Sequence, residues 1–272
     1  MIREQKWDRL RELLGEMKLA VVAYSGGVDS SLLLRAASEV MGPQLIAVTA
    51  VSDTFPQGEL EAAQAFVRSL GVIHRIIRTQ ELDNEQFVQN SPERCFHCKT
   101  VLFEKLAAIA ATEGIPFILD GSNSDDLNDL RPGRRATEAY SVRSPLVEAG
   151  ISKADVRRLA SLLNLPQWDK PSLACLSSRI PYGTRITKEI LNRIQQAENC
   201  LHGFGFRQVR VRHHGDTARI ELNKNDFSRL LAAEVADRVV AQLKELGYTY
   251  VSLDLAGYRT GSMNEGIKQS SQ

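Results

Sequence analysis

Two groups of residues in the sequence have the types and spacing needed for chemistry. The first is Ser25-Gly26-Gly27-Val28-Asp29-Ser30, which follows an apolar run at 19–23 and precedes three leucines at 32–34. Glycines leave no Cβ in the way and permit backbone torsions closed to other residues, so several N–H groups can converge on an anion where a helix begins. The stretch therefore suits a phosphate cradle, although glycine and serine are also common in ordinary strand-to-helix turns.

The second group consists of cysteines. Cys95 and Cys98 form a Cys-x-x-Cys pair, and Cys175 lies in the irregular, proline-containing segment 166–186. Four cysteines in a chain of 272 residues do not make a disulfide framework, and close pairs in a reducing compartment more often bind metal or take part in redox chemistry. Spacing alone leaves open a zinc site, or two structural thiols and one reactive cysteine. Cys200 shows no ligand spacing, and we expect it to be a buried, small apolar residue.

These residues need a scaffold, which the apolar pattern predicts. Expected strands alternate with expected amphipathic helices, and the first strand leads into the glycine loop while the fourth ends at Asp120-Gly121. Such alternation predicts an α/β fold with a parallel sheet and helices on both faces, in which ligands bind beyond the carboxyl ends of the strands. The expected strands are 18–24, 45–51, 72–77 and 116–121, and the expected helices are 3–15, 29–41, 59–70, 101–111 and 152–163.

After residue 186 the rhythm changes and predicts a smaller α+β domain, with a helix at 187–201, strands at 206–212, 217–222 and 248–254, and an interrupted helix at 226–246. Arg210 and Arg212 share one face of the first of these strands. Alternation alone favours a half-solvated sheet with its charges outside, but paired arginines on a rigid strand would also suit a phosphate monoester. We expect domains at 1–165 and 187–262, joined by the cysteine-bearing loop 166–186 and followed by a mobile tail at 263–272.

The composition predicts a near-neutral globular protein with a substantial core. The chain has 34 Lys plus Arg, 33 Asp plus Glu and 43% hydrophobic residues, so it offers no strong field to nucleic acid. The N-terminus is too charged for a secretory signal, and no apolar run approaches the roughly 20 residues that span a bilayer. We therefore expect a cytoplasmic protein without a membrane partner, for which a nucleic acid partner is disfavoured. As separate expectations, the protein forms a homo-oligomer and acts on a small-molecule nucleotide.

The pattern Ser-Gly-Gly-x-Asp-Ser between a strand and a helix resembles the PP-loop of the ATP pyrophosphatase superfamily, which has the adenine nucleotide α-hydrolase-like fold. The resemblance implies that the loop binds the pyrophosphate of ATP and that attack on the α-phosphate gives an adenylated intermediate. The loop lacks the Gly-Lys-Ser/Thr ending of a Walker loop, which argues against γ-phosphoryl transfer. The resemblance also implies that Asp120 and Gly121 line the nucleotide site. We expect Asp29 to reach Mg²⁺.

Further segments along nearly the whole chain resemble the LarE family of sulfur-inserting PP-loop enzymes, namely 24–30, 128–133, 177–184, 209–212, 218–222 and 253–261. This resemblance implies a substrate of the pyridinium-3,5-dicarboxylate mononucleotide type, adenylated on a ring carboxylate and then attacked by sulfur in nickel-pincer cofactor synthesis. Some members give up the sulfur of their own cysteine. Others bind a [4Fe-4S] cluster through three cysteines, and the cluster can hold an extra sulfide.

The chain has the three-cysteine arrangement. We therefore expect Cys95, Cys98 and Cys175 to bind a [4Fe-4S] cluster, with an exogenous or cluster-bound sulfide as the transferred atom and direct sacrifice of Cys175 as the alternative. We expect Arg210 and Arg212 to bind the substrate phosphate. A tRNA thiolase, an ATP-dependent amide synthetase and a non-catalytic nucleotide-binding module remain as alternative functions.

Overall fold

The computed structural model describes residues 4–55, 58–127, 132–171, 174–259 and 262. The chain divides into two compact units within the segment 166–186 that the sequence predicts as a linker, and the predicted domain boundaries stay a prediction. The expected tail at 263–272 and residues 128–131 of one family-like segment lie outside the described residues. The first unit comprises Met1–Ser52, Gln57–Phe87 and Pro92–Leu173, and the second comprises Asp53–Pro56, Val88–Ser91 and Ala174–Gln272.

The described part of the first unit is built on a parallel sheet of four strands in the order β3-β2-β1-β4. Successive residues of a strand point to opposite faces, and in β1 Ala20 and Val22 pack into one core cluster while Val21 packs into another. Both faces of β1 are therefore buried, which explains its unbroken apolar run in the sequence. The strands are β1 (Ala20–Ala23), β2 (Leu45–Val51), β3 (Ile73–Arg78) and β4 (Phe117–Leu119).

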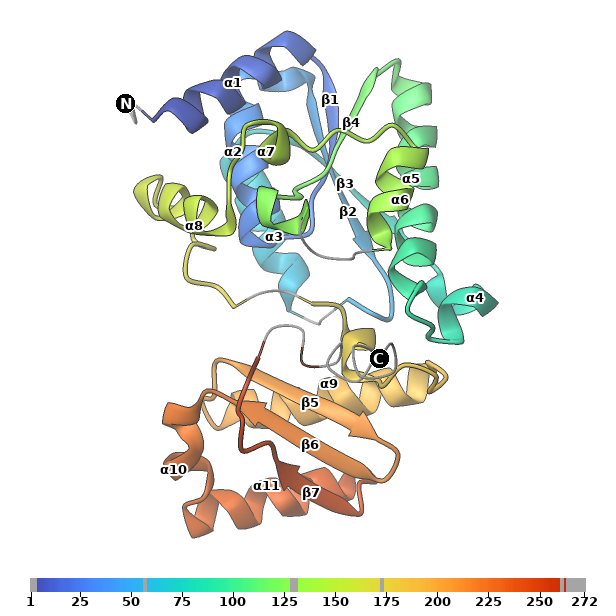
Figure 1. The fold of residues 1–272 in the computed structure, drawn as a ribbon, viewed down its shortest axis with the longest axis vertical. Coiled ribbons are helices and arrows are strands. Elements are labelled where there is room, and N and C mark those ends of the chain that lie inside the picture. Colours follow the sequence, from blue (N-terminus) through green and yellow to red (C-terminus); the bar gives the residue numbers. More distant parts are fainter. Residues whose placement is uncertain (1–3, 56–57, 128–131, 172–173, 260–261, 263–272) are drawn as a thin grey trace, which may run out of the picture. The chain divides into compact units, whose positions relative to one another are not determined.

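Helices cover both faces of this sheet, as Figure 1 shows. One face packs against α1 (Gln5–Met17), α2 (Val28–Met41), α3 (Glu59–Ser69) and α8 (Lys153–Leu162), and the other against α5 (Arg94–Glu113) and α6 (Gly133–Ala139). The predicted α/β fold is confirmed. Short elements complete the unit, namely α4 (Glu85–Val88), α7 (Pro145–Glu148), η1 (Gly42–Gln44), η2 (Glu81–Asp83) and η3 (Ser124–Leu127).

Helix α5 differs from its prediction, because it begins at Arg94 and not at Val101. Its N-cap residue, Glu93, already has helical torsions and makes no side-chain capping bond. The sequence does place Ser91-Pro92-Glu93 just before the helix, a pattern typical of a helix start that the prediction did not use. The consequence is functional, since Cys95 and Cys98 lie within the helix rather than in a turn that precedes it.

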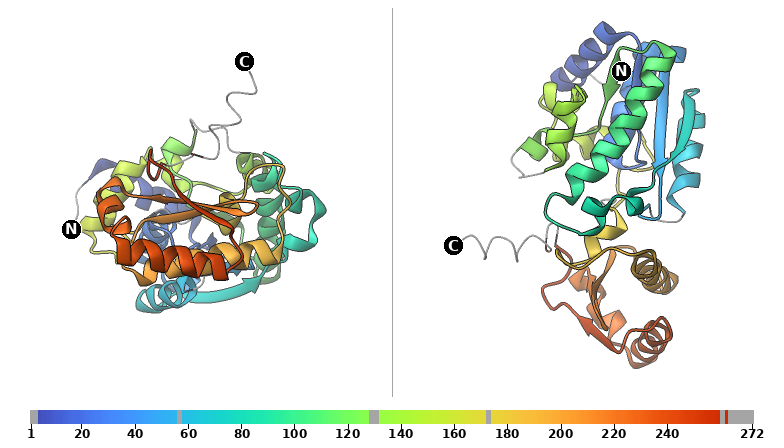
Figure 2. Two further views of the ribbon diagram at one scale, coloured as in Figure 1. Left: turned by 90° about the horizontal axis from the view of Figure 1, so that it is seen from below. Right: turned by 90° about the vertical axis from the view of Figure 1, so that its right-hand side faces the viewer.

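The second unit is the predicted smaller α+β domain. Its described sheet has β5 (Val209–His214) antiparallel to β6 (Thr217–Leu222), and β6 parallel to β7 (Tyr250–Leu253). Helices α9 (Lys188–Gly203) and α11 (Ala233–Glu245) pack on one face, where Val209 and Val211 join their core, and Figure 2 shows α11 along that face. The shorter elements are η4 (Leu176–Arg179), η5 (Lys224–Asp226) and α10 (Phe227–Leu230).

Ser152 and Asp155 have the spacing that predicts a capping box, and helix α8 begins with one. The Ser152 N–H donates to Asp155 Oδ2 over 3.1 Å, and the Asp155 N–H donates to Ser152 Oγ over 3.2 Å. Lys6 Nζ lies 2.6 Å from Asp155 Oδ2, and Arg158 also binds this carboxylate. The Lys6 ammonium and the Ser152 hydrogen bonds hold the pKa of the Asp155 carboxyl well below its ordinary value.

We expect Asp155→Asn to lower the free energy of unfolding at neutral pH by about 1 kcal/mol, through the weakened cap and ion pairs. A carboxylate whose pKa is lower in the folded state stabilises it above the unfolded pKa of about 3.9, and that contribution is lost as pH falls through the folded pKa. The deficit should therefore shrink below about pH 4. Urea unfolding at several pH values measures this loss of unfolding free energy, and Asp237→Asn on the exposed surface of α11 is the control. A deficit independent of pH would contradict this account.

Candidate active site

The loop after β1 passes from Tyr24 to Gly27, where α2 begins. Gly26 has a φ of 77°, in the left-handed region that favours glycine, whereas Gly27 has an ordinary φ of −77°. Ser30 Oγ donates to the Gly27 carbonyl over 3.1 Å and accepts from the Ser25 N–H over 3.3 Å. These bonds fix the loop against the first turn of α2.

The N-terminus of α2 is open to an anion. No side chain caps this end, where the N-cap residue is Gly27. The Ser31 N–H makes the first bond of the helix, to the Gly27 carbonyl over 2.9 Å, so the N–H groups of residues 28–30 have no partner within the helix. Because those groups lie at the positive end of the helix dipole, the arrangement suits a phosphate.

Asp120 and Gly121 lie beside this helix end. β1 lies between β2 and β4, so the chain reverses its direction across the sheet between β1 and β4, which is where open α/β sheets bind ligands. A Cβ on Gly121 would lie 2.9 Å from the Ser30 backbone nitrogen and 3.0 Å from its Cα. Only glycine permits this approach, so the fourth strand end and the glycine loop are brought together as a single site wall.

The Asp120 carboxylate organises that wall. It is buried and accepts hydrogen bonds from Ser122 Oγ over 2.7 Å and from Ser144 Oγ over 2.6 Å. Lys99 Nζ lies 3.3 Å from Asp120 Oδ2. Through these hydrogen bonds, Asp120 fixes the conformation of the chain that follows β4.

Asp29, the predicted Mg²⁺ ligand, has two partners that the sequence reasoning missed. Asn123 Nδ2 donates to Asp29 Oδ1 over 3.1 Å, and the Lys153 ammonium forms an ion pair with Asp29 Oδ2. The Lys153 N–H also donates to Asp125 Oδ2 over 3.0 Å. Lys153 opens α8, far away in the sequence, and no local pattern marks it. Each oxygen of the Asp29 carboxylate thus has a partner in this structure, and the role of Asp29 in binding Mg²⁺ stays a prediction.

Tyr24 is held through both its main chain and its side chain, and so fixes the start of the loop. Its carbonyl accepts from Thr49 Oγ1 over 2.9 Å, and Thr49 Oγ1 lies 2.9 Å from His74 Nε2. Its hydroxyl lies 3.4 Å from Ser31 Oγ on α2. Burial raises the pKa of Tyr24 to about 12 and lowers the pKa of His74 from its ordinary value.

Cys95 and Cys98 lie at the start of α5, three positions apart and therefore on the same side of the helix. Cys95 is exposed, and Cys98 is half-buried with its Sγ 4.0 Å from Glu81 Oε1. His97 lies two positions after Cys95, which turns it toward a different side of the helix. A shared metal would therefore draw on the two thiols rather than on His97.

Cys175 is the N-cap residue of η4 and is exposed. Cys200 is half-buried against the core of the second unit, with its Sγ 2.7 Å from Gln242 Oε1, and burial raises the pKa of its thiol. Cys95 and Cys98 belong to the first unit and Cys175 to the second. Among the residues that the structure describes, no three His, Cys, Asp or Glu side chains are grouped closely enough to hold a metal ion.

The charged face of β5 is buried, so the expected half-solvated sheet is wrong. Arg212 is 5% exposed and Glu221 is 0% exposed, and Arg212 Nη2 lies 2.7 Å from Glu221 Oε2. Arg212 Nη1 donates to the Ser178 carbonyl over 2.9 Å, and its Nη2 donates to Ser262 Oγ over 2.9 Å. η4 and Ser262 thus cover the charged face of β5. The alternation of charged and apolar residues along the strand cannot distinguish this buried face from a solvated one.

Arg210 lies on the same face, in a setting that is more positive. It is buried, its guanidinium lies 5.4 Å from the Tyr258 ring centroid, and it donates to the Val209 carbonyl over 2.6 Å. Burial and the nearby Arg179 lower its pKa from the ordinary value. An anion here would offset that positive charge, which agrees with the predicted phosphate site without testing it.

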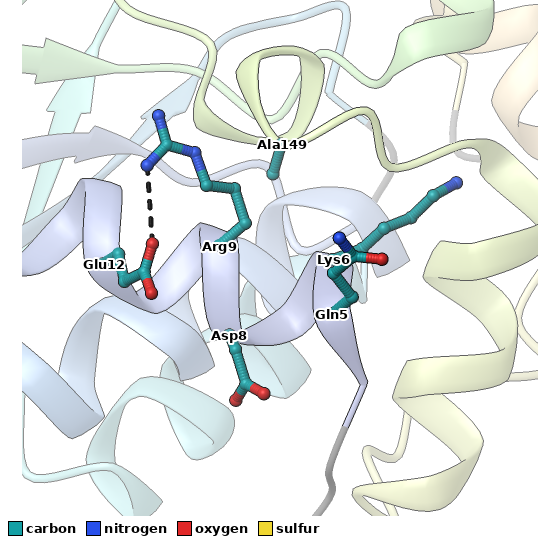
Figure 3. A pocket seen from close by; sticks show the side chains of 6 residues that line it. All are labelled: Gln5, Lys6, Asp8, Arg9, Glu12 and Ala149. Atoms are coloured by element: carbon teal, nitrogen blue, oxygen red, sulfur yellow. Dashed lines mark hydrogen bonds and ion pairs between the residues drawn. The ribbon is translucent and has the colours of Figure 1, made fainter.

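Elsewhere on the first unit, an open hollow is lined by α1 and by Ala149, which follows α7 (Figure 3). Its charged residues include Arg9 and Glu12, whose Nη1 and Oε2 atoms lie 3.4 Å apart. Among the described residues that line it, none comes from a strand end, so it is separate from the glycine loop. Of the helices in the described ranges, none is long and apolar enough to cross a membrane.

Comparisons with known proteins agree with this geometry. A family model described as asparagine synthase matches residues 20–127, which contain the glycine loop and β4. An uncharacterized protein of Synechocystis sp. is 42% identical over 96% of this chain and 97% of its own. The pyridinium-3,5-bisthiocarboxylic acid mononucleotide synthase of Lactiplantibacillus plantarum is 38% identical over 94% of this chain and 93% of its own. An uncharacterized protein of Methanocaldococcus jannaschii is 28% identical over 93% of this chain and 95% of its own.

We expect Gly121→Ala to weaken ATP binding by roughly tenfold or more, because its Cβ must displace the backbone at Ser30. Gly27→Ala has room, with its Cβ 3.4 Å from Ser25 Oγ, so a loss there would report contact with the phosphate itself. Titration calorimetry with ATP and Mg²⁺ measures both variants.

The matched control is Gly15→Ala in α1, where a Cβ meets nothing within 4 Å and should slightly stabilise the helix. Unchanged ATP affinity in Gly121→Ala, together with unchanged thermal stability, would show that this contact does not shape the site.

Proposed function

Because this chain belongs to the LarE family of ATP-dependent sulfurtransferases, we propose that it adenylates a carboxylate of pyridinium-3,5-dicarboxylate mononucleotide and then inserts sulfur, in nickel-pincer cofactor synthesis. The synthase of Lactiplantibacillus plantarum, whose printed name gives the bisthiocarboxylic acid product, supports this choice of substrate. Membership of this family favours it over the tRNA thiolase, the amide synthetase and the non-catalytic module.

The observation that carries the proposal is the uncapped N-terminus of α2 beside Gly121, at the point where the order of the strands reverses. Ser25, Gly26, Gly27 and Ser30 form the cradle for the pyrophosphate of ATP. Asp29 would hold Mg²⁺, an ion that prefers oxygen ligands and keeps several waters. Asp120 and Gly121 complete the wall.

The chemistry takes two displacements. In the first, a carboxylate oxygen of the acceptor attacks the α-phosphorus of ATP, the bond to the bridging oxygen breaks, and pyrophosphate leaves. The helix N-terminus stabilises the negative charge on the leaving pyrophosphate. In the second, sulfide attacks the acyl carbon, and AMP leaves with the oxygen, giving a thiocarboxylate. If the Cys175 thiolate attacks instead, a thioester forms, and loss of the Cys175 α proton with cleavage of its Cβ–S bond releases the thiocarboxylate and leaves dehydroalanine.

Cys95, Cys98 and Cys175 would bind the [4Fe-4S] cluster that the family resemblance implies. The donor set fits, because all three are thiols outside disulfides, Cys95 and Cys175 are exposed, and soft thiolates are the usual ligands of such clusters. When bound, the cluster supplies sulfide. Cys175 itself is the alternative sulfur donor, and its exposed position at the start of η4 suits either role.

Arg210 and Arg212 are the proposed ligands of the substrate phosphate. Guanidinium groups bind phosphate through paired, charge-assisted hydrogen bonds. Burial and the positive charge of Arg179 lower the pKa of Arg210, and an anion would offset that charge. Arg212 is fixed by Glu221, so it presents a rigid rather than a flexible guanidinium.

We expect Cys175→Ser to retain acceptor-dependent release of pyrophosphate but to lose thiocarboxylate formation, because adenylation needs no thiol. Anaerobic purification with iron and sulfide analysis, followed by mass spectrometry of the Cys175 peptide after turnover, measures the sulfur source. Intact Cys175 with several products per chain supports the cluster. Loss of about one H₂S at Cys175 per product, in protein lacking iron, would falsify the cluster mechanism.

We expect Arg212→Lys to raise the KM for the phosphorylated acceptor by roughly tenfold or more, because a charge-assisted hydrogen bond contributes about 1.5–3 kcal/mol. Lysine keeps a positive charge opposite the buried Glu221, so the fold should survive. ATP binding should be spared. Steady-state kinetics with the phosphorylated and dephosphorylated acceptors provide the comparison, and an equal loss for both would exclude the phosphate role.

A further inference from the structure

The main chain around Cys175 is held by one buried guanidinium. Arg179 is 2% exposed, and its Nη1 donates to the Ala174 carbonyl over 2.6 Å and to the Cys175 carbonyl over 3.0 Å. The Ser178 N–H also donates to the Cys175 carbonyl, over 3.0 Å. The backbone of Cys175 is therefore anchored although its thiol is exposed.

Glu198 on α9 holds Arg179 in turn. Arg179 Nε and Nη2 donate to Glu198 Oε1 and Oε2, each over 2.9 Å, which is the paired geometry that orients a guanidinium most strictly. Glu198 is 4% exposed, and its Oε1 also accepts the N–H of Val211 on β5 over 2.9 Å. A helix and a strand of the second unit thus determine where the Cys175 backbone lies.

Stability alone does not explain this pair. Removing two charges from water carries a large desolvation cost, and well-packed apolar residues often replace a buried ion pair without loss of stability. The pair does provide direction, because the Nε and Nη2 bonds to Glu198 fix the guanidinium plane while Nη1 binds two successive carbonyls. A reactive side chain needs such support, since small displacements of a reacting group reduce rates strongly.

We propose that Arg179 and Glu198 are positioning residues for Cys175, which hold its backbone so that the exposed thiol keeps one location during sulfur transfer. The role in sulfur transfer rests on the proposed function, whereas the hydrogen bonds that hold the Cys175 backbone do not depend on it. It applies whether Cys175 binds a cluster or gives up its own sulfur.

The test compares the wild type with the double variant Arg179→Met/Glu198→Gln. This variant removes both charges together, so neither remains buried alone, and the introduced glutamine keeps a side-chain oxygen for the Val211 N–H. Hydrogen exchange is followed by mass spectrometry in the peptide that covers 174–180. In that peptide the N–H groups of Leu176, Ser178 and Ile180 donate to the carbonyls of Thr54, Cys175 and Ser177.

We expect exchange in this peptide to accelerate by roughly tenfold or more in the double variant, while peptides of α2 and α11 keep their protection. Sulfur transfer should fall by roughly tenfold or more, with acceptor-dependent pyrophosphate release retained. Arg179→Lys keeps the charge and can still reach a carbonyl, but it lacks the planar fork, so its sulfur transfer should be intermediate.

Unchanged exchange at 174–180, or sulfur transfer at the wild-type rate, would overturn the positioning role. So would an equal fall in pyrophosphate release and sulfur transfer, because that pattern indicates a general loss of structure. Absence of sulfur transfer by the wild-type protein would instead contradict the proposed function, and the exchange result would stand by itself.

Discussion

A parallel sheet has an opening for a ligand where successive crossovers leave a strand in opposite directions. Here that strand is β1, whose neighbours are β2 and β4. The chain leaving β1 must turn tightly into α2, and the chain leaving β4 must pass beside the same helix end. Gly26 provides the turn through its positive φ, and Gly121 provides the close approach. The position of the uncapped α2 N-terminus thus follows from the order of the strands, and the other groups around the loop serve to keep it there.

In the second unit, paired buried charges rather than backbone geometry fix the structure. Its sheet presents arginines and carboxylates on one face, and the chain covers that face with η4 and Ser262. Each buried charge then needs a partner, and Glu221 and Glu198 supply partners for Arg212 and Arg179. At Arg210, burial and positive neighbours lower the pKa, which is the feature that an anionic ligand would relieve. The buried charges of the unit are therefore paired at Arg212 and Arg179, whereas Arg210 lies where positive charge accumulates.

Local pattern was enough for the alternation of strands and helices, the α/β fold that follows from it, and the capping box of α8. These features depend on residues near one another in the sequence, as Ser152 and Asp155 are. The start of α5 is predicted too late, because the expected helix is placed on the apolar residues from Val101 onward, although Ser91-Pro92 marks an earlier start. Lys153 and Asn123 could not be placed at Asp29 either, because only the tertiary fold brings them there. The burial of Arg212 likewise depends on segments that cover β5 from elsewhere in the chain.

The glycine loop and the charged face of β5 respond differently to substitution. The glycine loop acts through backbone N–H groups, which no side-chain change short of proline removes, so it is vulnerable chiefly to an added Cβ or to a shift of α2. The β5 face carries charges whose partners are buried, so removing one charge leaves its counterion buried with fewer partners and changes stability as well. Substitutions that keep charge balance are therefore the informative ones in the second unit, whereas substitutions that change volume are informative in the first. The difference follows from the source of the positive potential, which is aligned peptide dipoles at the N-terminus of α2 and guanidinium groups on β5 and η4.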